Sequence, residues 1–273
     1  MNKIIYDFGA SRGENIPYYL LKSDLIIAVE ADPRNCQYIE KKFHNEIKSG
    51  KLILEKCILA EKNEKIEKFY IHKNNYLLGQ FPRPIDSLNN DFFEIEISSK
   101  DVLEVIKFYG KPYYIKIDLE EYDEIILKRI LSNNIKPNYI SVEATNPNIF
   151  KLLYSLGEYN SYKLVEGNNV EYVYKNLKIY IKSIINKYSF PKNSSGPFGN
   201  EIYGAWINKE NFAELMEFKS WGWRDIHCSL FDLPEKEASP KKYINIEIKR
   251  DKKVKLTRRL LRIRSKFNFF SKD

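Results

Sequence analysis

The sequence predicts an α/β fold built on a doubly wound, mostly parallel sheet. Short apolar runs alternate with segments of helical pattern, which is the rhythm of strands joined through helices. Several of these runs are apolar throughout, as expected of parallel strands that are buried on both faces. Ligands of such sheets bind at the carboxyl ends of the strands. Four expected strands end in acidic residues, namely Asp7, Glu30, Asp118 and Glu143.

The expected elements follow one another closely in the first 160 residues. Strands are predicted at 4–6, 25–29, 52–54, 57–60, 69–71, 112–118 and 139–142, and helices at 33–43, 101–109 and 121–131. Residues 73–100 are rich in Asn and Pro and are predicted to form a long loop with an edge strand at 93–97. Beyond residue 160 the pattern predicts a strand at 162–165, a helix at 177–185, a loop at 193–200 and a last strand at 223–228.

The turn after the first strand is the most informative local feature. Asp7 is followed by Gly9 and Gly13, and glycines let the backbone approach a ligand closely. Glu30 ends the second strand 21 residues after Gly9, where an acid can hold both hydroxyls of a ribose. This arrangement predicts a site for an adenosine-containing cofactor.

The acid beside the glycines favours one such cofactor over another. A dinucleotide pyrophosphate is bound by bare amides at a helix N-terminus, so Asp7 disfavours it. S-adenosylmethionine carries a sulfonium and an ammonium group, which an acid suits. A nicotinamide-dependent oxidoreductase is therefore the weakest hypothesis. The residues predicted to bind S-adenosylmethionine are Asp7, Gly9, Ala10, Ser11, Gly13, Glu30, Ala31, Ala60 and Asp118.

The charge of the chain is concentrated at its C-terminal end. The 273 residues carry a formal net charge of +8, and the segment 247–273 alone has 11 Lys or Arg against 3 Asp or Glu. Residues 1–246 are therefore formally neutral and are predicted to form the globular part. Because the globular part carries no net charge, we do not expect a domain that binds nucleic acid over its whole surface.

Cysteine and histidine usage indicates a reduced compartment and no zinc centre. Cys36, Cys57 and Cys228 share no metal-type spacing, and their odd number fits free thiols in a cytoplasmic protein. Because the first strand begins at about Ile4, we expect no signal peptide. No apolar run reaches the length of about 18 residues that a membrane span needs.

With these segments in place, the chain resembles the FkbM family of S-adenosylmethionine-dependent methyltransferases. The resemblance rests on residues 7–13 and 29–33, and on Lys116-Ile117-Asp118-Leu119-Glu120-Glu121-Tyr122-Asp123 against the family motif K-I-D-x-E-G-x-E. Residues 140–143, 194–199 and 225–227 also match segments of relatives, so the likeness covers about 4–230. It implies a Rossmann-like class I methyltransferase domain at 1–246, with a cofactor half at about 1–160 and acceptor-side elements at about 161–246.

The resemblance also implies a reaction, with two departures from the motif. It implies O-methylation of a hydroxyl on a sugar, glycan or other small molecule. Glu121 replaces the usual glycine and Asp123 the usual glutamate, so substrate contacts at this turn transfer less directly. These departures keep open a non-catalytic nucleotide-binding or scaffold protein of the same fold.

Asp118, Glu120 and His227 are the candidate catalytic residues. A carboxylate or an imidazole with a pKa near neutrality can take the proton of the acceptor hydroxyl. Capping of the following helix explains Glu120 equally well, and a structural role explains His227 at least equally well. Asp118, Glu143 and Asn146 form an alternative set of oxygen ligands for Mg²⁺.

The basic segment 247–273 has a helical pattern of its own. Leu256, Leu260, Ile263, Phe267 and Phe270 share one face of a helix, with basic residues outside it. Such a helix suits an anionic membrane surface, which would place a cytoplasmic protein at the inner face of the membrane. Docking on its own domain, a coiled-coil seam and an RNA-binding tail are its rivals, and an RNA methyltransferase anchored by this tail is the alternative enzyme.

Overall fold

A computed structural model gives the structure of the protein and describes residues 2–63, 65–84, 90–181, 184–204, 206–218 and 224–231. The predicted basic helix in 247–273 and the first residue of the predicted last strand, Trp223, lie outside these ranges. Of the helices within them, none is both long enough and apolar enough to cross a bilayer.

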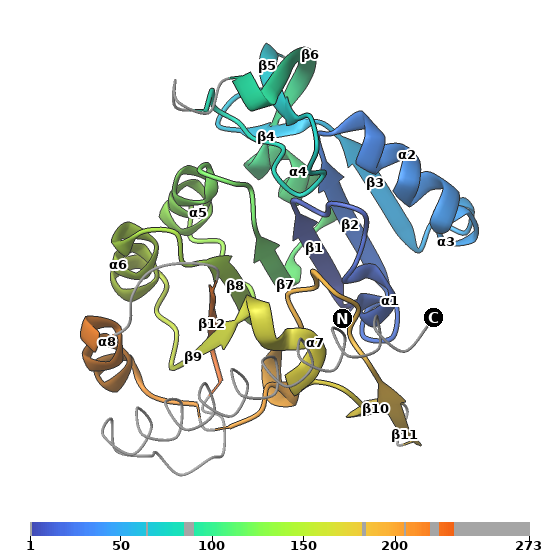
Figure 1. Ribbon diagram of the computed structural model, residues 1–273. Helices are drawn as coiled ribbons and strands as arrows, with labels where there is room; N and C mark the ends of the chain where they lie inside the picture. Colours follow the sequence, from blue (N-terminus) through green and yellow to red (C-terminus); the bar gives the residue numbers. More distant parts are fainter. Residues whose placement is uncertain are drawn as a thin grey trace, which may run out of the picture.

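A seven-stranded sheet runs through the centre of the protein (Figure 1). Its strand order is β3-β2-β1-β7-β8-β12-β9, and the first five strands are parallel to one another. The strand β12 runs antiparallel to both of its neighbours. The bounds are β1 Ile4–Phe8, β2 Leu25–Glu30, β3 Leu52–Lys56, β7 Pro112–Ile117, β8 Tyr139–Glu143, β9 Ser161–Glu166 and β12 Arg224–Ser229.

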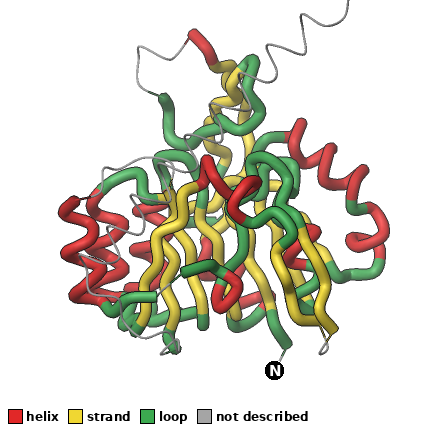
Figure 2. Tube along the Cα trace, turned by 60° about the horizontal axis from the view of Figure 1, so that its bottom comes forward, coloured by secondary structure: helices red, strands yellow, loops and turns green. Residues whose placement is uncertain are grey.

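Helices cover both faces of this sheet, as the tube in Figure 2 shows. On one face α4, α5, α6 and α8 bury residues of the larger apolar core, and on the other α1, α2 and α7 contribute to a second core. The doubly wound, mostly parallel fold that the sequence predicts is thus confirmed. The bounds are α1 Ile16–Tyr19, α2 Pro33–Lys42, α3 His44–Lys48, α4 Val102–Tyr109, α5 Asp123–Ser132, α6 Pro147–Leu156, α7 Val170–Val173 and α8 Lys209–Phe218, with short 3-10 helices at Gly167–Asn169 and Gly199–Glu201.

Local sequence explains where several of these helices begin. The Asp32 side chain accepts a hydrogen bond from the amide of Arg34 and caps α2, and Pro33 fits the first turn. Asp101 caps α4 in the same way through the amide of Leu103. The predicted helices at 33–43 and 101–109 are confirmed within one residue.

A smaller sheet of three strands stands beside the upper end of β1 and β2 in Figure 1. Its strands are β4 Ile58–Ala60, β5 Ile66–His72 and β6 Phe92–Asp101, and β6 pairs with both of the others. The connection from β5 to β6 contains residues 73–84 and 90–91 of the predicted long loop, and residues 92–100 belong to β6. The edge strand predicted at 93–97 is thus wrong in one respect, because β6 is the middle strand of this sheet.

The helix predicted at 177–185 is wrong. This segment forms an antiparallel hairpin of β10 Leu177–Ile181 and β11 Ile184–Tyr188. Burial alternates along β10, with Leu177 and Ile179 buried and Lys178 and Tyr180 exposed, which is the two-residue period of a strand. Short apolar runs do not distinguish the two periods, and packing of this inner face against the second core selects the strand.

Candidate functional site

A cavity of about 380 Å³ lies at the carboxyl ends of β1, β2, β7 and β8. This is the edge of the sheet at which an α/β protein binds its ligands. Of the residues predicted from the sequence, Gly9, Ala10, Ser11, Glu30, Ala31, Asp118, Glu120 and Glu143 line it.

The turn between β1 and α1 forms one wall of the cavity. Gly9 has a φ of +80°, and a Cβ at this position would lie 1.8 Å from the carbonyl oxygen of Asp118. Only glycine fits there, because the backbones after β1 and β7 touch. The amides of Gly9 and Ala10 both donate to the carbonyl oxygen of Val29 at 3.0 Å, which ties the turn to β2.

Glu30 is held in place by backbone amides. Its carboxylate accepts from the Ser11 amide at 2.6 Å and from the Asp32 amide at 2.8 Å, one bond to each oxygen. Glu30 is 8% exposed, and burial raises the pKa of its carboxyl group to about 8. A carboxylate has about four acceptor positions, so two remain for a ligand after these bonds.

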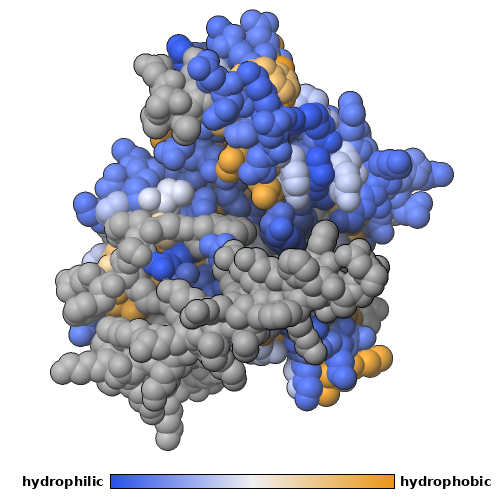
Figure 3. Space-filling view, in the orientation of Figure 1, coloured by the Kyte–Doolittle hydropathy of each residue, from blue (hydrophilic) through white to orange (hydrophobic). Residues whose placement is uncertain are grey.

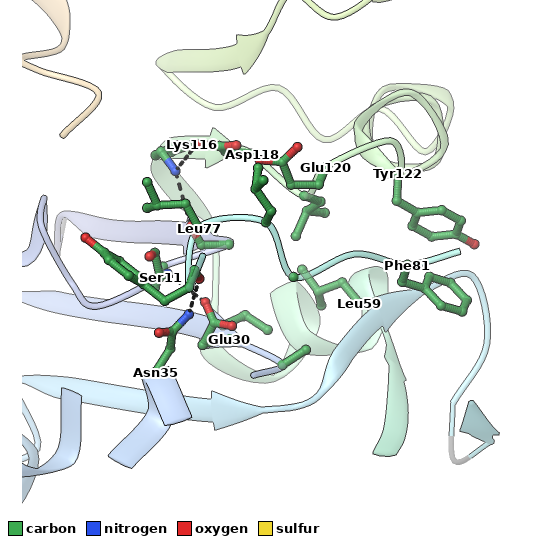
Figure 4. A pocket seen from close by; sticks show the side chains of 18 of the residues that line it. Ser11, Glu30, Asn35, Leu59, Leu77, Phe81, Lys116, Asp118, Glu120 and Tyr122 are labelled. Carbon is green, nitrogen blue, oxygen red and sulfur yellow. Dashed lines mark hydrogen bonds and ion pairs between the residues drawn. The ribbon is translucent and has the colours of Figure 1, made fainter. Parts of the chain in front are cut away.

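Beyond Glu30 the cavity wall becomes apolar (Figure 4). Phe81 and Tyr122 meet edge to face with ring centroids 4.8 Å apart, and Leu59 lies beside them. This part of the wall offers a surface for a flat ring. Its described members are Ala31, Cys57, Ile58, Leu59, Phe69, Leu78, Gly79, Phe81 and Tyr122.

Tyr76 anchors the loop that closes the cavity. Arg12 lies over its ring at 3.7 Å from the centroid, and its hydroxyl donates to Glu14 at 3.2 Å. The Asn193 amide donates to the same hydroxyl at 3.0 Å, and the Asn35 amide donates to the Tyr76 carbonyl oxygen at 2.9 Å. The predicted loops at 73–100 and 193–200 thus meet at the cavity.

Lys116 forms a buried charge cluster under the floor of the cavity. Its Nζ lies 3.0 Å from Asp118 Oδ2 and 3.7 Å from Asp7 Oδ1, and it donates to the Gly9 carbonyl oxygen at 3.3 Å. Burial alone would lower the pKa of Lys116, but the neighbouring carboxylates, Asp118 first, raise it, so the side chain is a charged ammonium. Lys116 thus holds the ends of β1 and β7 together through buried charges.

Three carboxylates converge at the other side of the cavity. Oxygens of Asp118, Glu120 and Glu143 lie within 4.8 Å of one another. Burial first, and then the charge of Asp118, raises the pKa of Glu120 to about 8 and that of Glu143 to about 10. Glu143 is 9% exposed, and no described residue forms a hydrogen bond or ion pair with its side chain. We call Asp118, Glu120 and Glu143 the acidic triad.

The turn after β7 places Glu120 in the triad. Glu120 and Glu121 have φ values of +46° and +67°, in the left-handed region that favours glycine. The Asp123 side chain accepts from the Leu119 amide at 2.9 Å and closes the turn. The glycine that the family motif has at this place would suit the conformation. In this chain Glu121 adopts it, with its side chain exposed.

Four residues that were predicted to contact a ligand do not line the cavity. Asp7 is fully buried beneath the cavity, where it contacts Lys116 and not the open space. Gly13 serves the turn, because a Cβ there would lie 2.7 Å from the Phe43 ring. Ala60 lies just past the cavity lining, in which Leu59 takes its place. Asn146 caps α6 by accepting from the Asn148 amide at 2.8 Å, and Glu120 replaces it beside Asp118 and Glu143.

His227 lies outside the cavity, so the prediction of a catalytic base at this position is corrected. It sits on β12 between β8 and β9, is 2% exposed and does not line the cavity. Burial first, and then the charge of Lys163, lowers the pKa of His227 to about 3. The imidazole is therefore neutral and enclosed within the sheet.

Two other buried acids lie close to the site but outside the cavity lining, and neither was predicted as a site residue. Asp225 is aligned with Glu143 across β12 and β8, and burial first, then the charge of Asp118, raises its pKa to about 7. Asp123 is 1% exposed and stabilises the turn that carries Glu120. The alternation of β12 offered a signal for Asp225, since it shares a sheet face with His227.

The chain matches a known protein family and is similar to several solved structures. The Methyltransferase FkbM domain matches residues 7–166. Among solved structures, the chain is similar to a methyltransferase FkbM from Methylobacillus flagellatus KT (18% identity, 60% of this chain and 40% of that chain, TM-score 0.41). It is also similar to a precorrin-6y C5,15-methyltransferase from Geobacter metallireducens GS-15 (14%, 59% and 63%, 0.32) and a dimethyladenosine transferase from Plasmodium falciparum (10%, 61% and 49%, 0.33).

The family assignment follows from the domain match. The match with the Methylobacillus flagellatus structure spans 40% of that chain, less than half of its length. A comparison with curated proteins gave no match. The FkbM domain, by contrast, covers more than half of the 273 residues and includes the glycine turn, Glu30 and the acidic triad. The chain belongs to the FkbM family of methyltransferases.

Proposed function

We propose that the protein is an S-adenosylmethionine-dependent O-methyltransferase that acts on a hydroxyl of a sugar, a glycan or another small molecule. The observation that carries the proposal is Glu30, which lines the cavity with acceptor positions to spare beside the glycine turn. A carboxylate of this kind can accept hydrogen bonds from both hydroxyls of a ribose. The cavity of about 380 Å³ also falls in the size range of small-molecule sites.

The walls of the cavity fit the remaining parts of this cofactor. The apolar wall around Leu59, Phe81 and Tyr122 can hold an adenine ring, and the acidic side suits the positive charges of the methionyl part. When bound, S-adenosylmethionine supplies a methyl group on a sulfonium. Lys116 offsets part of the negative charge through Asp7 and Asp118, which keeps the floor of the cavity ordered.

Glu120 is the residue that we assign as the proton acceptor for the acceptor hydroxyl. It lines the cavity, and its raised pKa of about 8 matches the range in which a general base works near neutral pH. The Glu120 carboxylate would take the proton of the hydroxyl, while the methyl group comes from the cofactor, which keeps the electron pair of the broken sulfur–carbon bond as a thioether. Asp118 is paired with Lys116 and serves to orient groups at this end.

Calorimetric titration with S-adenosylmethionine tests the proposal. We expect binding by the intact protein, no binding of NAD⁺, and loss of binding in Glu30→Ala. Glu46→Ala, a change of the same kind in α3, is the matched control and should bind as the intact protein does. Binding of NAD⁺ in place of S-adenosylmethionine would contradict the proposal, and binding of neither would favour the scaffold alternative.

Methyl transfer to candidate acceptors distinguishes the two enzymatic hypotheses. Labelled methyl groups should enter hydroxyl-bearing sugars or glycans and leave RNA unlabelled. The formally neutral residues 1–246 support the small-molecule class, because they lack the excess of positive charge that RNA binding uses. Labelling of RNA that persists without residues 247–273 would favour the RNA methyltransferase instead.

A divalent cation is a second ligand that we propose for the acidic triad. Three carboxylate oxygens lie within 4.8 Å of one another, and Glu143 is buried with no ion-pair partner among the described residues. Such a group of oxygens suits a hard cation such as Mg²⁺. In that case Asp118, Glu120 and Glu143 would hold the ion, and Glu120 would act as an ion ligand in place of the proton acceptor. Titration of the protein with Mn²⁺, followed by electron paramagnetic resonance, should show binding that Glu143→Gln removes and Glu121→Gln retains. No binding, or binding that both variants retain, would exclude the ion.

A further inference from the structure

The β10–β11 hairpin has an exposed face that no described part of the chain covers. Its inner face, with Leu177 and Ile179, is buried in the second core. The hairpin projects from the lower right of the molecule in Figure 1, and apolar atoms mark its end in Figure 3. The exposed side chains on its outer face are therefore directed into solvent.

Large apolar side chains gather toward the free end of this hairpin. Tyr180 and Ile185 are cross-strand partners on the outer face and are 64% and 56% exposed. Ile184, in the next pair toward the turn, lies on the opposite face of the hairpin and is 66% exposed at its free end. Single exposed apolar residues are common on protein surfaces, but a cluster at a projecting end indicates a contact surface.

Two lysines lie on the same face of the hairpin, farther from the turn than these apolar side chains. Lys178 and Lys187 are aligned across the two strands on the same face as Tyr180 and Ile185, and both are exposed. Like charges directly opposite each other destabilise a strand pair. Neither lysine forms an ion pair with any described residue. An anionic partner would relieve this repulsion.

Charge selects among the partners that could cover an apolar surface. A second copy of the chain, docked symmetrically through this face, would bring lysines against lysines. The segment 247–273, with 11 Lys or Arg against 3 Asp or Glu, is also basic and would meet the same repulsion. The occupant that fits is anionic and accepts apolar side chains.

We propose that the outer face of the β10–β11 hairpin binds the surface of an anionic lipid bilayer. Tyr180 and Ile185 enter the interfacial region, and Lys178 and Lys187 stay at the level of the headgroups. Tyrosine suits this boundary because its ring is apolar and its hydroxyl is polar. The proposal stands on the hairpin alone and does not depend on the reaction of the cavity.

Vesicle sedimentation with the full chain tests this surface. The intact protein should pellet with vesicles of phosphatidylcholine and phosphatidylglycerol (about 70:30) and much less with phosphatidylcholine alone. Lys178→Glu/Lys187→Glu should weaken binding to the anionic vesicles at least about tenfold, since each basic residue near such a surface contributes about 1 kcal/mol. Tyr180→Ser/Ile185→Ser should weaken it severalfold. These positions are exposed, and thermal unfolding checks that each variant is folded.

A charge-matched control separates the hairpin from general basicity. Lys41→Glu/Lys48→Glu changes two exposed lysines on α2 and α3 and gives the same net charge as the hairpin reversal. This control should keep binding within about twofold. Equal weakening by both charge reversals would overturn the proposal, as would hairpin variants that bind like the intact protein or an intact protein that does not bind anionic vesicles at all.

Discussion

The two ends of the cavity hold carboxylates in opposite ways. At one end Glu30 accepts two backbone amide hydrogen bonds, one on each oxygen, and its position is fixed by the glycine turn. At the other end the acidic triad gathers three carboxylates, and Lys116 reaches one of them, Asp118. Both Glu30 and Glu120 have a pKa of about 8, raised chiefly by burial in each case.

This difference indicates a division of work. A carboxylate whose geometry is fixed by amides is suited to recognise a ligand, because little order is lost when the ligand binds. A carboxylate crowded by like charges is suited to take up a proton or a cation, because either relieves the repulsion. We therefore expect changes at the Glu30 end to affect cofactor affinity and changes at the acidic triad to affect turnover.

The largest effect is expected from Glu120→Gln. Removing the proton acceptor should lower methyl transfer by a factor of about 10²–10⁴, the usual contribution of a general base. Labelled methyl transfer at saturating cofactor measures the effect. Glu121→Gln, in the same turn and exposed, is the control and should keep its rate. Equal rates in Glu120→Gln and the intact protein would remove Glu120 from this role.

Lys116→Met should have the next largest effect, on stability. It leaves Asp7 and Asp118 without their buried counter-charge, and breaking a buried pair of this kind costs about 3–5 kcal/mol. Urea unfolding measures the change in the free energy of unfolding. Adding Asp7→Asn should recover part of the loss. A loss below about 1 kcal/mol in the single variant would contradict the buried charge cluster.

The pH dependence of cofactor binding should report Glu30. Below its pKa of about 8 the side chain carries a proton and accepts hydroxyl donors less well, so affinity should rise severalfold from pH 6 to a plateau above pH 8. Glu30→Gln should remove this rise, and the difference between the two curves cancels titration of the ligand. Identical curves for both proteins would assign the dependence to another group.

The same shift has a consequence for stability of the unliganded protein. The unfolded chain releases the Glu30 proton near the ordinary value of 4.5, whereas the folded protein holds it to about 8. The contribution of Glu30 to the free energy of unfolding should therefore decrease as the pH rises through this window. Glu30→Gln should flatten that part of the stability curve in urea unfolding.

The smallest effect is expected at the turn that carries the triad. Glu121 has a φ of +67°, so Glu121→Gly should raise the free energy of unfolding by about 0.5–1 kcal/mol. Glu121→Ala keeps a Cβ and should give no such gain. Stabilisation of equal size in both variants would assign the effect to the lost charge and not to the backbone.

Features set by local sequence could be predicted, and those set by distant contacts could not. The glycine turn and Glu30 follow from a strand, a turn and the next strand, and the nearness of Asp118 to Glu143 follows from the ends of two parallel strands. The turn after β7 then brings in Glu120 in place of the predicted Asn146. Tyr76 and Asn193 are 117 positions apart in the chain and meet only in the folded protein. His227 is the opposite case. Its residue type and its strand suited a catalytic base, but its side chain is buried within the sheet.

The measurement that tests the division of work most directly is the affinity for S-adenosylmethionine in two isosteric variants at pH 7. Glu30→Gln should weaken binding about tenfold, because it removes charge-assisted bonds of about 1.5–3 kcal/mol each, and the loss of the Glu30 proton that these bonds require at pH 7 offsets part of this contribution. Glu120→Gln should change it less than about threefold, since with a pKa of about 8 this side chain is already largely protonated at pH 7. Equal losses in both variants, or a larger loss in Glu120→Gln, would contradict the account.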